Sequence, residues 1–153
     1  MAKGAPLTRD YFAEMYVAGI LADNNWNVYF PRRDKGFDFI ITKEVEGKTI
    51  IRPVQVKGKY PEKTKTDKQT YGYRGRLTAV HKNMILAIPF FSTTGIGKSP
   101  LFTAFMPFEK IVKMPKQYRC EPAVFKDGNP IPRRDFRKYF DLDGIKLLEK
   151  EEN

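Results

Sequence analysis

The chain is 153 residues long, a length typical of one domain with its own core, and its formal net charge is +10 at pH 7. One cysteine excludes an internal disulfide, and together with one histidine it excludes zinc sites built from these residues, so any chemistry must use carboxylates, amides and lysines. No apolar run approaches the ~20 residues that cross a membrane, and the first residues lack the hydrophobic segment of a signal peptide, which favours a cytoplasmic protein.

The positive charge favours a polyanionic partner. Nucleic acid is the first candidate and an anionic membrane the second. A basic surface without any binding role is an alternative that charge alone leaves open. The sequence pattern along the chain is therefore needed to choose between these interpretations.

The N-terminal part predicts a helix followed by a strand. Thr8 can cap a helix that runs to about Asn24 or Asn25, because apolar residues recur there at helical spacing. Glu14 lies inside this helix, either as a solvated residue or facing a site. Residues 26–30 form the first predicted strand, which a proline stops, and Arg32 and Arg33 follow in a charged turn.

Two further strands are predicted at residues 36–41 and 50–57, joined by a polar hairpin loop at 42–48. Because side chains alternate along a strand, Gln55 and Lys57 share one face and the valines between and before them share the other. On the neighbouring strand Asp38 lies opposite Phe37 and Phe39. A carboxylate among apolar residues needs a partner, for which Lys57 or a bound cation are the candidates.

An acid, an amide and a lysine at the ends of adjacent strands form a minimal set for phosphodiester hydrolysis. The oxygens of Asp38 and Gln55 are hard ligands of the kind that Mg²⁺ prefers. The ammonium of Lys57 can orient an attacking water and offset charge that develops on the phosphate. The pattern therefore predicts a magnesium-dependent phosphodiesterase.

Asp38 followed by Gln55-Val56-Lys57, with Glu14 on the preceding helix, resembles the PD-(D/E)XK nuclease superfamily, in particular its Gln-x-Lys members such as Mrr-like restriction endonucleases. The resemblance implies that Asp38 ligates the metal, Gln55 replaces the usual acid, Lys57 is catalytic and Glu14 is a direct or outer metal ligand. The cofactor would be Mg²⁺ or Mn²⁺. Two positions depart from the family pattern, since the proline before the first acid is absent and Gln55 is neutral.

The same resemblance implies an α/β (α+β) fold with a restriction-endonuclease-like αβββαβ core, a mixed central sheet and an N-terminal helix. We expect a single domain over residues 1–153, with a core at about 7–112 and an irregular or helical extension at 113–153. Within the extension, residues 123–125 could form a short edge strand and residues 133–150 one interrupted helix or two short ones. Residues 84–91 predict a buried central strand and residues 101–106 another, followed by a helical turn at 107–112.

Residues 58–82 interleave cations with tyrosines and glycines and show no amphipathic stripe. A strand or short helix is predicted only between Thr70 and Val80. Cations attract phosphates and tyrosines stack on bases, so substrate contact is favoured over a silent mobile loop. The predicted nucleic-acid-binding residues are Arg32, Arg33, Lys59, Lys63, Lys65, Lys68, Tyr71, Tyr73, Arg74 and Arg76.

The sequence thus predicts a metal-dependent nuclease, with DNA as the expected substrate and an endonuclease as the expected type. One alternative is a nucleic-acid-binding protein on the same scaffold without hydrolytic activity. Another is a structural or assembly protein in which the acid and the Gln-x-Lys pattern are fortuitous. A homodimer is compatible with an enzyme that cuts both strands, although no patch in the sequence indicates one.

Overall fold

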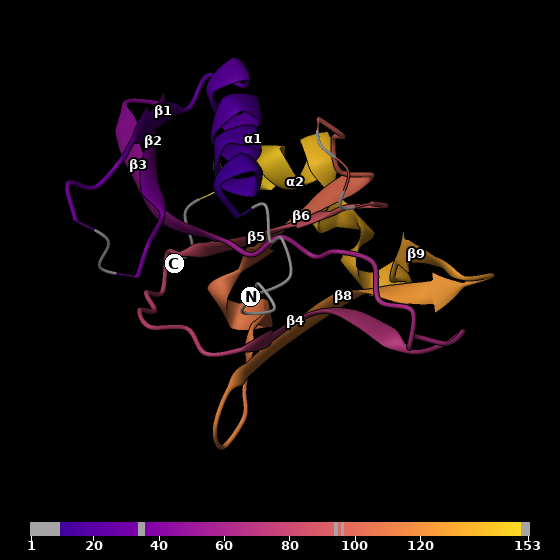
Figure 1. The fold of residues 1–153 in the computed structure, drawn as a ribbon. Helices are drawn as coiled ribbons and strands as arrows, with labels where there is room; N and C mark the ends of the chain where they lie inside the picture. Colours follow the sequence, from indigo (N-terminus) through magenta and orange to yellow (C-terminus); the bar gives the residue numbers. More distant parts are fainter. Residues whose placement is uncertain (1–9, 34–35, 94, 96, 151–153) are drawn as a thin grey trace, which may run out of the picture.

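The computed structural model describes residues 10–33, 36–93, 95 and 97–150, which form three layers (Figure 1). The middle layer is a five-stranded sheet, called sheet A here, in the order β1-β2-β3-β5-β6. Its strands are β1 (Asn27–Tyr29), β2 (Phe39–Val45), β3 (Lys48–Val56), β5 (Ile85–Phe90) and β6 (Phe102–Pro107). The helices α1 (Asp10–Asp23) and α2 (Asp141–Leu147) lie on one side of sheet A, and a second sheet, sheet B, lies on the other.

Helix α1 forms as the apolar spacing predicts. Its buried residues are Ala13, Val17, Ala18 and Leu21, which line one side of the helix and pack on β3 and β5. The helix ends at a turn in which Asn25 adopts a positive φ of 71°. The predicted cap, Thr8, lies outside the described residues.

The β2–β3 hairpin is tighter than the polar loop predicted at 42–48. The strands pair from Phe39↔Val54 to Val45↔Lys48, so only Glu46 and Gly47 form the turn. Both turn residues have positive φ, 52° and 79°, as two-residue hairpin turns of this type require. The prediction of a seven-residue loop was wrong because the polar residues Thr42, Lys43 and Glu44 continue strand β2, which has one face toward solvent.

Pro53 is tolerated within β3 because the pairing of β3 with β5 begins only at the next residue, Val54↔Ile85. Strand β5 runs parallel to β3 and antiparallel to β6. All six of its residues are buried, as predicted for a central strand. Its alternate residues enter two separate cores, Ile85 and Ala87 on the side of the helices and Leu86, Ile88 and Phe90 on the side of sheet B.

Sheet B contains β4 (Thr70–Gly75), β8 (Tyr118–Lys126) and β7 (Val112–Lys113) in the order β4-β8-β7, with β9 (Asn129–Pro132) also paired with β8. The irregular or helical extension predicted at 113–153 was therefore wrong for residues 118–132, most of which form strands. Pro122 is accommodated at a bulge where Gly72 of β4 crosses β8. A Cβ on Gly72 would lie 2.4 Å from the carbonyl oxygen of Cys120, so this close approach requires glycine.

The C-terminal part contains two short 3-10 helices and α2, which agree with the helical turn predicted at 107–112 and with two short helices within 133–150. The 3-10 helices are η1 (Phe108–Lys110) and η2 (Arg134–Tyr139). The buried side chain of Arg52 in β3 connects α2 to sheet A. Its Nε donates to the carbonyl oxygen of Leu148 at 2.7 Å, and its two Nη atoms donate to those of Asn83 and Lys150 at 3.2 and 2.5 Å.

The predicted mixed α+β fold is confirmed, with an N-terminal helix and a mixed central sheet. One element differs from the αβββαβ pattern. Residues 57–84, which connect β3 to its parallel neighbour β5, contain strand β4 and no helix. Among the described residues, no helix is long and apolar enough to span a membrane.

Candidate functional site

The carboxylate of Asp38 is attached to the end of β3. Asp38 lies one residue before β2, and its backbone N–H donates to the carbonyl oxygen of Val54 at 2.9 Å. Its Oδ2 accepts a hydrogen bond from the N–H of Val56 at 2.6 Å. The structure therefore brings Asp38 to the segment that carries Gln55 and Lys57, and a backbone amide fixes the orientation of its carboxylate.

The side chain of Gln55 is buried, with 6 % of its surface exposed. It lies on the face of β3 opposite Val54 and Val56, which pack in the core under α1. Its Oε1 is buried and has no hydrogen-bond partner among the described residues. A buried amide oxygen without a partner is unfavourable, and such atoms in native proteins call for a structural or functional reason.

Lys57 follows β3 directly, and its backbone N–H donates to the carbonyl oxygen of Ala87 at 2.9 Å. Its ammonium lies 5.4 Å from the ring centroid of Tyr73, on β4. Burial raises the pKa of the Tyr73 hydroxyl, which donates a hydrogen bond to the carbonyl oxygen of Arg76. Lys57 makes no ion pair with Asp38, so of the two partners that the sequence suggested, Lys57 or a bound cation, the lysine is wrong. Within the described residues the carboxylate accepts from the backbone N–H of Val56.

Glu14 lies on the side of α1 that faces the sheet. With about 3.6 residues per turn, it falls within the arc spanned by Ala13, Val17 and Ala18, and its side chain is half-buried. A Cβ on Gly58 would lie 3.3 Å from the Cβ of Ala13, which places this part of α1 beside the chain just after Lys57. Because α1 covers the face of β3 opposite Gln55, Glu14 approaches the strand end from the other side of the sheet.

The three groups at the end of β3 are called the strand-end site here: the carboxylate of Asp38, the amide of Gln55 and the ammonium of Lys57. Within the described ranges, no cluster of three or more His, Cys, Asp or Glu side chains could hold a metal ion. The strand-end site would instead offer one carboxylate and one amide oxygen, with Glu14 near the strand end.

No family model, curated protein or solved structure matches this chain. The fold and the strand-end site therefore stand on the residues of this chain alone.

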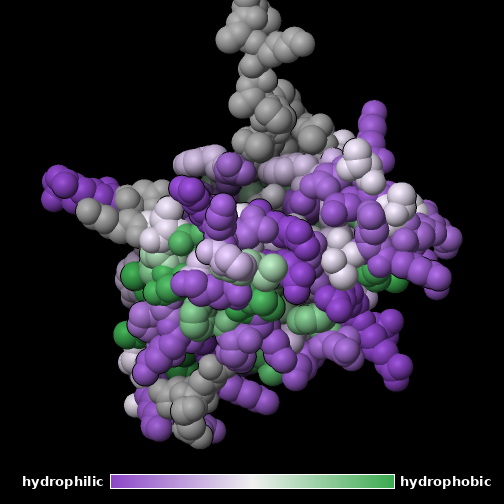
Figure 2. Space-filling view, turned by 90° about the horizontal axis from the view of Figure 1, so that it is seen from below, coloured by the Kyte–Doolittle hydropathy of each residue, from purple (hydrophilic) through white to green (hydrophobic). Residues whose placement is uncertain are grey.

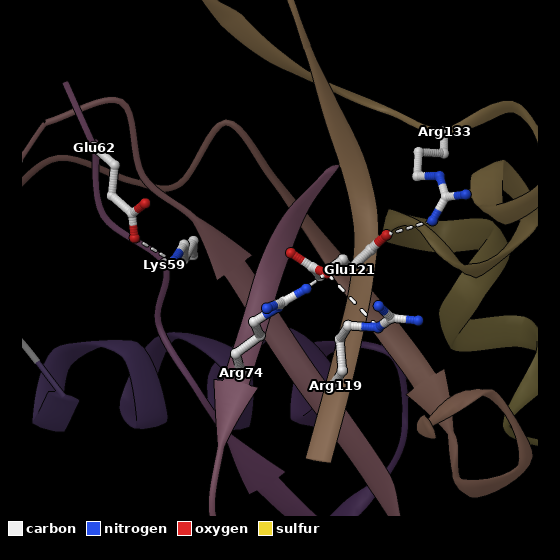
Figure 3. A network of polar contacts seen from close by, with 6 residues as sticks. All are labelled: Lys59, Glu62, Arg74, Arg119, Glu121 and Arg133. Carbon is white, nitrogen blue, oxygen red and sulfur yellow. Dashed lines mark hydrogen bonds and ion pairs between the residues drawn. The ribbon is translucent and has the colours of Figure 1, made fainter. Parts of the chain in front are cut away.

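The predicted nucleic-acid-binding residues divide into two groups. Arg32, Arg33, Lys63, Lys68 and Arg76 are exposed. Several others are engaged within the protein, as Figure 3 shows for two of them. Lys59 pairs with Glu62 at 2.5 Å, and Arg74 pairs at 3.3 Å with Glu121, whose side chain is only 7 % exposed.

Tyr71 differs most from its predicted role. It is 2 % exposed and packs against Phe90 and Phe125 at ring-centroid distances of 5.8 and 4.6 Å. Its hydroxyl donates to the carbonyl oxygen of Tyr60. Tyr71 is therefore a core residue and cannot stack on a base, whereas Tyr73, two residues along β4, is half-buried beside Lys57.

Sequence reasoning missed two polar features. Arg52 is buried and binds carbonyl groups near the end of α2, although its sequence context resembles that of any charged strand residue. Lys113 ends β7 and Lys116 lies in the tight β7–β8 connection, in which the N–H of Met114 donates to the carbonyl oxygen of Gln117 at 2.7 Å. The signal for this hairpin was Met114-Pro115-Lys116-Gln117, a proline-containing segment between Ile111-Val112 and Tyr118.

Proposed function

We propose that this protein is a metal-dependent nuclease that hydrolyses phosphodiester bonds, with DNA as the expected substrate, and that it is related to the PD-(D/E)XK nucleases. The observation that carries the proposal is the buried Oε1 of Gln55, which has no hydrogen-bond partner among the described residues. Gln55 precedes Val56, whose N–H binds the carboxylate of Asp38, and lies two residues before Lys57. A bound cation would give that oxygen the partner that the protein does not provide.

The donor set fits a hard divalent ion such as Mg²⁺ or Mn²⁺. Asp38 has one oxygen engaged by Val56 and a second that can bind the ion together with Oε1 of Gln55. An ion held by these oxygens would stabilise charge on the phosphate and make the attacking water more acidic. Glu14, near the same strand end on α1, is the remaining carboxylate that the resemblance assigns to the metal.

Lys57 has the role of positioning water and neutralising phosphate charge. Its ammonium, beside the ring of Tyr73, is not engaged by any described carboxylate and is therefore available to a phosphate. Positive charge aimed at the phosphate acts most strongly in the transition state, when charge on its oxygens increases.

The test is to titrate Mg²⁺ and Mn²⁺ against plasmid, linear duplex, branched and single-stranded DNA. Lys57→Ala should reduce the cleavage rate by about 10²–10³-fold, as is typical when one transition-state donor is removed, and should retain binding. Lys126→Ala, an exposed lysine of β8, is the matched control and should cleave like the parent. Equal cleavage by the Lys57 variant and the parent would remove Lys57 from the mechanism.

The second candidate is a nucleic-acid-binding protein with no hydrolytic activity. The neutral Gln55 favours it, because an amide holds a divalent ion less tightly than the acid usual at this position. Binding whose affinity falls steeply with salt, with no cut in the presence of any divalent ion, would support this candidate over the nuclease.

A further inference from the structure

A groove of about 470 Å³ lies between the chain that follows β4 and the β7–β8 hairpin. Arg76, Leu77 and Thr78 form one wall, and the hairpin forms the other with Lys113 and Lys116. The hairpin projects from the body at the lower edge of Figure 1. Figure 2, a view from below, shows that hydrophilic side chains dominate the visible face, with smaller hydrophobic patches among them.

The lining of this groove is basic. Arg76, Lys113 and Lys116 are exposed, and no acidic residue lies among the described residues of its wall. None of the three cations pairs with a described carboxylate. Lys113 is held over the ring of Tyr118, 5.6 Å from its centroid.

Three cations outside the groove, by contrast, form ion pairs with glutamates. Arg74 and Arg119 both point at Oε1 of Glu121, at 3.3 and 3.8 Å (Figure 3). Lys59 pairs with Glu62 in the same way. Arg74 and Arg119 on sheet B are therefore compensated by Glu121, whereas the three cations of the groove have no such partner among the described residues.

Tyr73 lies between the groove and the strand-end site. Tyr73 contacts Lys57 with its ring and Arg76 with its hydroxyl, so it connects the two. The wall also packs against the segment before Asp38. A Cβ on Gly36, whose φ is +104°, would lie 2.6 Å from the Cβ of Ala79, so only glycine permits this contact.

We propose that this groove binds the sugar–phosphate backbone of a nucleic acid and leads it to the strand-end site. Three uncompensated cations along one groove match a chain of phosphates, and they require no particular base sequence. The direction of the strand toward Lys57 rests on the proposed nuclease function, whereas backbone binding in the groove does not. The substrate class is therefore a nucleic acid long enough to extend from the cleaved bond to the hairpin.

The experiment measures the binding of a short fluorescent DNA duplex in EDTA, so that no cleavage occurs. The test variant is Lys113→Glu with Lys116→Glu, and the control is Lys82→Glu with Lys126→Glu, which changes the net charge equally at exposed lysines outside the groove. The groove variant should bind at least about tenfold more weakly than the control. The neutral pair Lys113→Gln and Lys116→Gln should reduce the slope of log K against log salt by about 2, since each lost phosphate contact contributes about 0.9.

Equal affinity of the groove variant and the control would overturn the proposal, as would an unchanged salt slope in the neutral pair. The proposal would also be overturned if the groove variant lost affinity for polyglutamate but kept its affinity for the duplex. Thermal unfolding of each variant checks that the fold is kept, and the neutral pair gives a second measurement should charge reversal disturb the hairpin.

The outcomes for the groove and for the nuclease are distinguishable. If the parent cuts DNA and the groove variant binds like its control, the groove proposal fails and the nuclease stands. If the parent cuts nothing with any divalent ion and the groove variant still loses binding, the nuclease proposal fails and the groove stands as a nucleic-acid-binding site.

Discussion

The strand-end site contains one residue, Gln55, whose side-chain oxygen has no hydrogen-bond partner among the described residues. Gln55 buries an amide oxygen without a hydrogen-bond partner, while the neighbouring carboxylate of Asp38 is held firmly by the N–H of Val56. An unpaired buried polar atom costs stability of the order of 1–3 kcal/mol. The proposed metal site would explain why a residue that lowers stability stands at a strand end to which the carboxylate of Asp38 is attached.

Replacing Gln55 by methionine tests this explanation. Gln55→Met keeps the volume and removes the unpaired oxygen, so the free energy of unfolding should rise by roughly 1 kcal/mol in urea titrations without metal. Mn²⁺ should raise the melting temperature of the parent and not that of the variant. Gln117→Met, in the β7–β8 hairpin, is the control and should change neither quantity. Destabilisation by Gln55→Met would mean that the oxygen has a partner in solution.

The attachment of Asp38 to the end of β3 that carries Gln55 and Lys57 could be predicted because it depends on strand alternation and on one hairpin, both of which are local in sequence. The difference in burial between Tyr71 and Tyr73 could not be predicted from the sequence. Both lie on the same face of β4, but Tyr71 is covered by Phe90 and Phe125, which come from distant strands. The burial of a tyrosine in a basic segment is thus decided by tertiary packing, which the pattern Tyr-Gly-Tyr does not contain.

At the scale of elements, the connection between β3 and β5 is the main departure from expectation. Its strand β4 pairs with β8, whose residues lie about fifty positions later, as in the pair Tyr71↔Ala123. The sequence around β4 does not show which distant segment pairs with it. The partner β8 was also hard to predict, because four prolines at 115–132 are typical of irregular structure. The first three strands of sheet A were predictable because their partners are sequence neighbours.

Arg52 carries the attachment of α2 to β3, so Arg52→Met should be strongly destabilising. It donates to the carbonyl oxygens of Leu148, Lys150 and Asn83, and hydrogen bonds from a charged donor contribute about 1.5–3 kcal/mol each. We expect the free energy of unfolding to fall by roughly 3 kcal/mol or more in denaturant titrations.

Arg137→Met, at an exposed position of η2, is the control for Arg52→Met and should change the unfolding free energy by less than about 0.5 kcal/mol. Similar values for the two variants would show that the carbonyl groups near the end of α2 are satisfied by water when Arg52 is absent.

At the scale of the whole molecule, the net charge of +10 should make nucleic-acid binding strongly dependent on salt. If three to five phosphates are neutralised, log K should fall with log salt with a slope of about −3 to −5 for duplex DNA. Fluorescence anisotropy at several salt concentrations gives this slope. A duplex analogue with an uncharged backbone should not bind, and a slope near zero for DNA would contradict an electrostatic interface.

Strand β5 contributes residues to both hydrophobic cores, so the helices on one side of sheet A and sheet B on the other depend on the same strand. Because Ile85 and Ala87 enter one core and Leu86, Ile88 and Phe90 enter the other, neither core is complete without residues from this one strand. Loosening either layer uncovers apolar surface on a strand that the opposite layer also needs, so the helices and sheet B should melt together as one cooperative unit. The strand-end site, which lies between them, would then be lost in the same step as both cores.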